Sequence, residues 1–165
     1  MPLSCANWRR VWRTLRRMGE IGDAEYVKMA VGVLLPFTDA DAVPAKRHGR
    51  NANWDVFAPY YAFNFILYGK SPRYKPPGNA VAWRCKGSYK PGDPEPAVRE
   101  ESFSKLWNNR APGLLHLLAE SQCRPVHHFA VKALRTCTEL LNSLDNEAAI
   151  MLIGRPYEVT AQLGC

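Results

Sequence analysis

The chain has 165 residues, of which 47% are hydrophobic and 22% are charged, and its formal net charge is +7. This length and composition suit one globular domain with a buried core. They exclude a membrane-spanning protein, because the longest apolar stretches, near 29–37 and 58–68, are too short or too interrupted to cross a bilayer. No secretory leader is visible either, so we expect a soluble, cytoplasmic protein with no membrane partner.

The first predicted helix, 8–18, is amphipathic. Its apolar stripe is formed by Trp8, Val11, Trp12 and Leu15. The opposite face is basic and consists of Arg9, Arg10, Arg13, Arg16 and Arg17. Three interpretations stay open: a helix that contacts nucleic-acid phosphates, a helix on a membrane surface, and a solvated face on the first helix of a stack.

The next predicted elements are a helix from Tyr26 to Leu35, capped by Asp23 and ended by Pro36, and a polar loop over 37–53. The loop carries a basic cluster, Lys46, Arg47 and Arg50, that could contact phosphates or simply be solvated. The first helix and this one form a predicted first helix pair over residues 1–36. Together with Arg9, Arg10, Arg13, Arg16 and Arg17, the loop cluster makes up the candidate nucleic-acid site.

An aromatic segment, 53–68, predicts a helix that begins near Pro59, and a Pro/Gly-rich insertion follows over 69–98. The insertion cannot be helical, although 80–85 reads as a short extended segment that Trp83 holds against the helices. Aromatic and basic residues alternate here, as they do in single-strand nucleic-acid sites. The candidate exposed stacking residues are Tyr60, Phe63, Tyr74, Trp83 and Tyr89.

The clearest pattern is a pair of short helices between Gly113 and Cys137, each with a proline in its first turn. The first buries leucines, and the second carries an apolar stripe of Val126, Phe129, Ala130, Ala133, Leu134 and Cys137. Weaker copies lie on both sides, and Arg155-Pro156 repeats Arg124-Pro125 at an offset of 31 residues. Repeats of this size indicate a helical solenoid.

We therefore predict an all-α fold: a HEAT-like α-solenoid of antiparallel helix pairs with a long Pro/Gly-rich insertion. One domain, 1–165, would comprise the first helix pair (1–36), the loop, aromatic helix and insertion (37–98), and the repeat helices (99–165). In the last part, Asp145 would cap a helix that stops at Gly154, and a final helix after Pro156 is expected to be truncated at the C-terminus. A chain cut there is a fragment of a longer protein or dimerises through its uncapped end.

From Trp54 onward the chain resembles HEAT-like repeat regions of bacterial proteins, some of which are joined to a WGR domain. The segments that carry the resemblance are ILYGKSPRY (66–74), AWRC (82–85), AVREESFSKLW (97–107), LLHLLAESQCRPVHHFAVKALR (114–135) and GRPYEVTAQLG (154–164). The resemblance implies a helical architecture and names no functional residue. The Trp-Gly-Arg string itself is missing from the sequence.

No enzyme motif was found: there is no G-x-G-x-x-G, P-loop, G-x-S-x-G or H-E-x-x-H string. The five dispersed cysteines contain no C-x-x-C pair, and Cys123 with His127 and His128 matches no familiar metal spacing. We expect no catalysis, cofactor or metal. A minor alternative is a HEAT-repeat DNA glycosylase with Asp55 as its acid, and the pair Glu100/Glu101 is read as a solvated helix start.

The leading hypothesis is a non-catalytic scaffold that binds another protein through a concave surface lined by His127, His128, Lys132 and Arg135. The alternative is a nucleic-acid-binding protein, with a link to DNA processing, that uses the basic first helix and the aromatic insertion. Charge is uneven along the chain, and this favours an anionic partner for its first half. Residues 1–90 hold 15 Lys and Arg against 6 Asp and Glu, and residues 91–165 hold 7 against 9.

Overall fold

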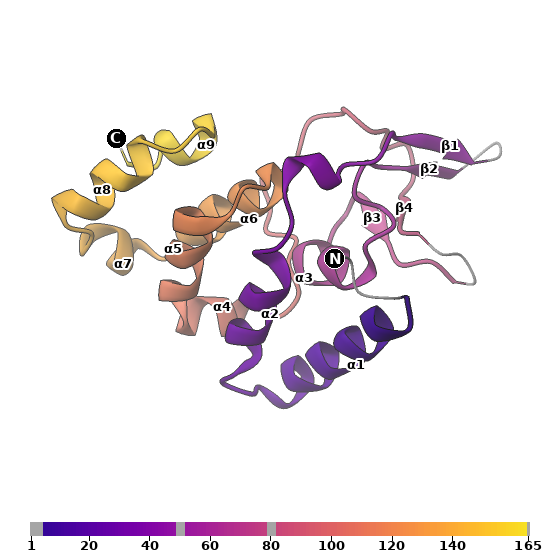
Figure 1. The fold of residues 1–165 in the computed structure, drawn as a ribbon, viewed down its shortest axis with the longest axis horizontal. Helices are drawn as coiled ribbons and strands as arrows, with labels where there is room; N and C mark the ends of the chain where they lie inside the picture. The colour runs from indigo at the N-terminus through magenta and orange to yellow at the C-terminus, as the bar shows by residue number, and fades with distance from the viewer. Residues whose placement is uncertain (1–4, 49–51, 79–81, 165) are drawn as a thin grey trace.

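The computed structural model describes residues 5–48, 52–78 and 82–164 (Figure 1). Most elements in these residues are helices, which confirms the helical class. They are α1 (Cys5–Ile21), α2 (Tyr26–Leu34), the 3-10 helix η1 (Asp39–Asp41), α3 (Tyr61–Tyr68), α4 (Ser104–Asn109), α5 (Ala111–Glu120), α6 (Arg124–Leu134), α7 (Thr138–Asn142), α8 (Asn146–Ile153) and α9 (Glu158–Ala161). The short strands are β1 (Lys46–His48), β2 (Ala52–Trp54), β3 (Tyr74–Lys75) and β4 (Arg84–Cys85).

Helix α2 lies at the centre of the fold and packs against α1, α3, α4 and α5 (Figure 1). Its side chains Tyr26 and Leu34 are fully buried, as is Trp107 of α4. Helices α2 and α5 approach closely at Gly113, where an added Cβ atom would lie 2.7 Å from Val27 Cγ1. Glycine suits this position of α5, because a side chain here would meet the Val27 side chain of α2.

The predicted central pair is present as α5 and α6, and each helix has a proline in its first turn. The two helices pack against each other through the expected leucines and through Val126, Phe129, Ala130, Ala133 and Leu134. Local sequence signals are sufficient here because a stripe and a proline define each helix without reference to distant residues.

The predicted capped helix near the C-terminus is also present. The Asp145 carboxylate accepts a hydrogen bond of 2.8 Å from the Ala148 N–H, and α8 ends at Gly154. Helix α9 is shorter than predicted and ends at Ala161. Beyond it, Leu163 and Gly164 donate backbone hydrogen bonds three residues back, to Thr160 and Ala161, the tightening that closes a helix end.

One predicted helix cap and one predicted helix start are wrong. Helix α2 starts after Glu25, and Asp23 accepts a hydrogen bond of 2.9 Å from the Glu25 N–H rather than capping the helix. The helix start expected at Glu100 and Glu101 lies later in the chain, because α4 begins only at Ser104. The cause is Phe103, whose φ of 55° lies in the left-handed region and cannot continue an α-helix.

The predicted loop over 37–53 is partly ordered as a β-hairpin, in which Lys46 pairs with Trp54 and Arg47 with Asn53. A second hairpin inside the insertion pairs Tyr74 with Cys85. Trp83 is buried against Tyr61 of α3, as expected for a side chain that holds the insertion on the helices. The two hairpins lie together beside α3 in Figure 1.

Asp39 joins the first third of the chain to its last third. Its Oδ1 accepts a hydrogen bond of 2.6 Å from the Arg124 N–H at the start of α6, and its Oδ2 accepts one of 2.9 Å from the Tyr157 hydroxyl. Next to it, Thr38 and Gln122 form a parallel β-bridge. None of the helices in the described ranges is long and apolar enough to cross a membrane.

Candidate functional site

The basic face of α1 is exposed. The apolar face is packed, with Trp8 against Phe37 and Trp12 against Tyr61. The arginines that face solvent are Arg9, Arg10, Arg13, Arg16 and Arg17. One of them is paired, because Arg16 Nε lies 2.7 Å from Glu20 Oε1, and this hydrogen bond raises the pKa of Arg16.

The loop cluster does not join this face. Lys46 and Arg47 are exposed on β1, whereas Arg50 lies outside the described residues. Figure 1 shows α1 along the lower edge and β1 at the upper right, with the β3–β4 hairpin between them. The structure therefore does not bring α1 and β1 into one groove.

The predicted stacking platform is wrong for most of its members. Phe63, Tyr74 and Trp83 are buried and cannot stack on bases. Tyr60 and Tyr89 are half-buried, and the Tyr60 hydroxyl donates a hydrogen bond of 2.9 Å to the Asp41 carbonyl. The aromatic residues of the insertion serve its core instead.

His127 was predicted to belong to the partner-binding surface, but it does not. This side chain is fully buried, with Nδ1 2.7 Å from Thr160 Oγ1 and Nε2 2.9 Å from the Ser121 carbonyl, and its ring packs on Tyr157. Burial lowers the pKa of His127 below 6.5. Helix α6 contacts both α5 and α9, so the side that appears polar in the sequence is covered.

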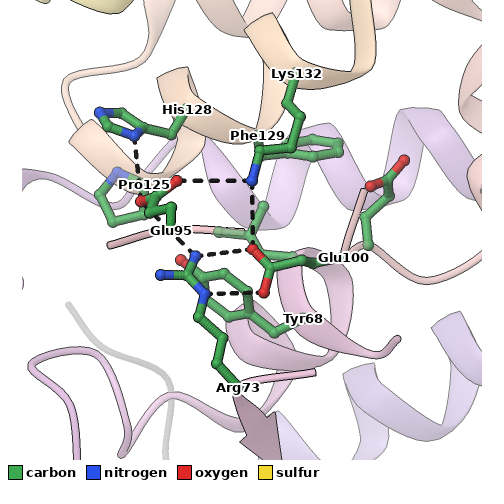
Figure 2. Close-up of a pocket in the computed structure, with 10 residues that line it drawn as sticks. Tyr68, Arg73, Glu95, Glu100, Pro125, His128, Phe129 and Lys132 are labelled. Carbon is green, nitrogen blue, oxygen red and sulfur yellow. Dashed lines mark hydrogen bonds and ion pairs between the residues drawn. The ribbon is translucent and has the colours of Figure 1, made fainter. Parts of the chain in front are cut away.

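His128 and Lys132 are half-buried and belong to an ion-pair network, while Arg135 is exposed. We call this network the Arg73 cluster; it contains Arg73, Glu95, Glu100, His128 and Lys132 (Figure 2). It joins the insertion to α6. Sequence reasoning missed it as a site.

Arg73 is the centre of the cluster and is almost fully buried. Its Nε and Nη2 lie 2.9 and 2.8 Å from the two carboxylate oxygens of Glu100, in a bidentate pair. Its guanidinium also lies over the rings of Tyr68, Tyr74 and Tyr89, at 5.3, 5.0 and 5.6 Å from their centroids. A buried charge requires this degree of pairing, because isolation from water would otherwise cost several kcal/mol.

Glu100 and Glu101 are therefore buried rather than solvated at a helix start. Glu100 accepts a further hydrogen bond of 2.6 Å from the Ser71 hydroxyl, and Glu101 pairs with Arg99. No periodic signal could have found the Arg73–Glu100 pair, because its partners are 27 residues apart in irregular structure. The only local signal was an arginine followed by a tyrosine inside the insertion.

Glu95 is the more exposed acid of the cluster. Figure 2 shows its carboxylate between His128 and Lys132 of α6 and Arg73. The distances are 3.2 Å to His128 Nδ1, 3.7 Å to Lys132 Nζ and 3.7 Å to Arg73 Nη2. The hydrogen bond with His128, followed by the charges of the cluster, lowers the pKa of Glu95 from 4.5 to about 2.

A cavity of about 200 Å³ adjoins the cluster and is lined by Asp55, Tyr74, Tyr89 and Glu95, among others. Asp55, the candidate acid of the glycosylase alternative, is held by internal hydrogen bonds. It accepts one of 2.7 Å from the Val56 N–H and another from the Tyr74 hydroxyl. Burial raises the pKa of Tyr74, so this phenol stays a hydrogen-bond donor to Asp55.

Across the described residues, no three His, Cys, Asp or Glu side chains come together in a way that could hold a metal ion. Cys123 is fully buried, and its burial raises the pKa of its thiol to about 12. A protonated, buried thiol is a poor metal ligand or nucleophile.

Comparison with protein-family models, with curated proteins and with solved structures gives no match for this chain. The resemblance to HEAT-like repeat regions therefore rests on the sequence segments alone.

Proposed function

We propose that this protein is a non-catalytic module that binds nucleic acid through the arginine face of α1. The observation that carries the proposal is the exposure of all five arginines on one helix, whose opposite face is anchored in the core. The sequence also predicted a concave binding surface on α6. There His127 is buried, and His128 and Lys132 are engaged in ion pairs. The arginine face of α1, by contrast, is exposed.

The spacing of the arginines suits a row of phosphates. Arg9, Arg13 and Arg17 follow one ridge of α1, and eight residues of helix cover about 12 Å. Contacts of this kind release counterions and carry no sequence information. Double-stranded nucleic acid is the favoured ligand, since three of the five aromatic side chains that were candidates for stacking on unpaired bases are buried.

The test is duplex binding across a salt series. If four to five phosphates are contacted, the slope of log K against log[salt] should be about −4. Changing Arg9, Arg13 and Arg17 to Gln should weaken binding and flatten the slope by roughly 3. The matched control changes the exposed lysines Lys75, Lys90 and Lys105 to Gln, which removes the same charge elsewhere. Equal losses in both variants would reject α1 as the contact surface.

We also propose that the helix pairs form a HEAT-like solenoid. In support, α8 contacts α5 and α9 contacts α6, as the corresponding helices of successive repeats would. Because a terminal repeat has only one neighbour, hydrogen exchange should be fastest in α8–α9 and slowest in α5–α6. Uniform exchange would contradict the proposal.

A cytoplasmic location accords with the free thiols of Cys85, Cys123 and Cys137. Dimerisation through the C-terminal end stays a prediction.

A protein partner is the second candidate, favoured by an open groove between α2 and α5. Its apolar residues include Val27, Val31 and Pro112, and Lys28 and Arg110 lie along it. Gly32 also lines the groove and has no neighbour within 4 Å of an added Cβ atom, so Gly32→Glu would place a charge there without a clash. This second function predicts a partner protein that binds the wild type and does not bind the Gly32→Glu variant.

A further inference from the structure

The segment 90–98, which we call the strap, is held on α6 by few contacts. The Lys132 ammonium donates a hydrogen bond of 2.9 Å to the Pro96 carbonyl, and Glu95 reaches the cations of the Arg73 cluster. Other hydrogen bonds of the strap, in the residues that the structure describes, join Asp93 to Lys90 and Tyr89, which are its sequence neighbours. Most strap residues are exposed, including Val98 at 58%. One carboxylate and one carbonyl therefore make the polar contacts between the described residues of the strap and α6.

Three basic side chains, Arg73, His128 and Lys132, surround the Glu95 carboxylate, although the most buried of them, Arg73, already has a partner. Glu100 gives Arg73 both of its carboxylate oxygens. Lys132 is shared between Glu100, at 3.5 Å, and Glu95, at 3.7 Å, and it lines the same small pocket as His128 (Figure 2). Without Glu95, this place would hold more positive than negative charge, partly screened from water.

We propose that this pocket is a binding site for a phosphate monoester, and that Glu95 occupies it as an internal competitor. A phosphate monoester suits the site because it carries close to two negative charges at neutral pH and offers three acceptor oxygens. The ligand displaces the Glu95 carboxylate and takes its place beside His128 and Lys132. The adjoining cavity, which Glu95 and Tyr89 also line, accommodates the rest of the molecule. The strap is released when the ligand binds.

The first test uses inorganic phosphate and the variant Glu95→Gln, followed by NMR of the His128 ring and the α6 amides. The variant keeps the shape of the side chain and removes the competing charge, so it should bind phosphate about tenfold more tightly than the wild type. Glu120→Gln, an exposed change on α5, is the control and should match the wild type. Equal affinity in all three proteins would overturn the proposal.

The second test uses the wild-type protein, so that it does not depend on how a variant folds. The NMR signals of the strap should shift in phosphate relative to chloride at equal ionic strength, because the strap is released. Acetate at the same ionic strength should have a smaller effect, because it carries a single charge. Unchanged strap signals in phosphate, or an equal effect of acetate, would overturn the phosphate assignment.

A DNA duplex separates this site from the proposed function. Its phosphates are diesters with one charge each, so it should shift signals of α1 and leave those of His128 unchanged. Shifts of His128 with DNA would assign the pocket to the nucleic-acid contact and overturn the present proposal. Failure of DNA to bind anywhere would contradict the function of α1 and leave the phosphate measurements unaffected.

Discussion

Arg73 shows how one buried charge organises an irregular segment. Its guanidinium donates hydrogen bonds to the Glu100 carboxylate and the Tyr89 hydroxyl and packs between tyrosine rings, so it fixes the insertion against α3 and α6. An apolar residue could fill the same space, but only a fork of donors can hold several acceptors at defined angles. The insertion contains no helix among its described residues. Side-chain hydrogen bonds of Arg73 hold it in position there, as backbone hydrogen bonds do within a helix.

Removal of the acid that pairs with Arg73 should be costly. Glu100→Gln leaves a buried guanidinium without its charged partner, and we expect the free energy of unfolding to fall by about 3 kcal/mol in urea denaturation. Glu95→Gln is the matched comparison, because its carboxylate is about 37% exposed and its loss should cost less than about 1 kcal/mol. Similar losses in the two variants would mean that Glu100 is not the essential partner.

His127 illustrates what residue patterns can and cannot predict. It lies off the apolar stripe of α6, so spacing placed it on the surface. The helix is covered from several sides, and Val131, also off the stripe, is buried as well. Whether a helix has one buried face or two depends on elements that pack against it from elsewhere in the chain.

Among elements, those with local signals were predicted best. Helix α1, the α5–α6 pair and α8 each have a stripe, and α5, α6 and α8 also have a proline or an aspartate at the start. The exposed arginines of the candidate nucleic-acid site follow from the same α1 pattern. Local spacing therefore predicted the helical class and the exposed arginine face of α1.

The hairpins and the Arg73 cluster were not predictable in this way. Strands of two or three residues, such as β3 and β1, are too short to show an alternating pattern. Glu100 is 27 residues away from Arg73, and His128 comes from a different element again. Such contacts arise only after α3 and α6 have packed together, and no single segment encodes them.

The α8 cap permits a test at the level of one element. Asp145→Ala removes the acceptor for the Ala148 N–H, and we expect a loss of about 1 kcal/mol together with faster hydrogen exchange in α8. Asp145→Asn keeps an acceptor oxygen and should lose less. Faster exchange in α5 and α6 to the same extent would show that α8 does not open separately.

For the whole molecule, stability should be greatest from neutral to mildly alkaline pH. The pKa of His127 lies below 6.5 and that of Glu95 at about 2 rather than 4.5, so the unfolded chain binds more protons than the folded one in acid. The stabilisation from His127 is present above about pH 6.5 and that from Glu95 above about pH 4.5. Each is lost as the pH falls through the folded value. Burial raises the pKa of Tyr26 and Tyr68, so a further loss is expected above about pH 10.

Urea denaturation at a series of pH values measures this profile. The unfolding free energy of the wild type should decline below pH 6.5 and again between about pH 4.5 and 2. In Glu95→Gln the second decline should be smaller. A variant with an unchanged acid profile would show that Glu95 is not held in its charged form by the cluster.

The bonds of Asp39 set an order of events during synthesis. Its two partners, Arg124 and Tyr157, are 85 and 118 residues further along the chain. At about 5–20 residues per second, a ribosome takes roughly 4–17 seconds to reach Arg124 after Asp39 has been made. During that interval α2 also lacks α5, the helix that covers it at Gly113. The nascent N-terminal third, which carries the arginine helix, therefore cannot complete its core until α5 and α6 have been synthesised.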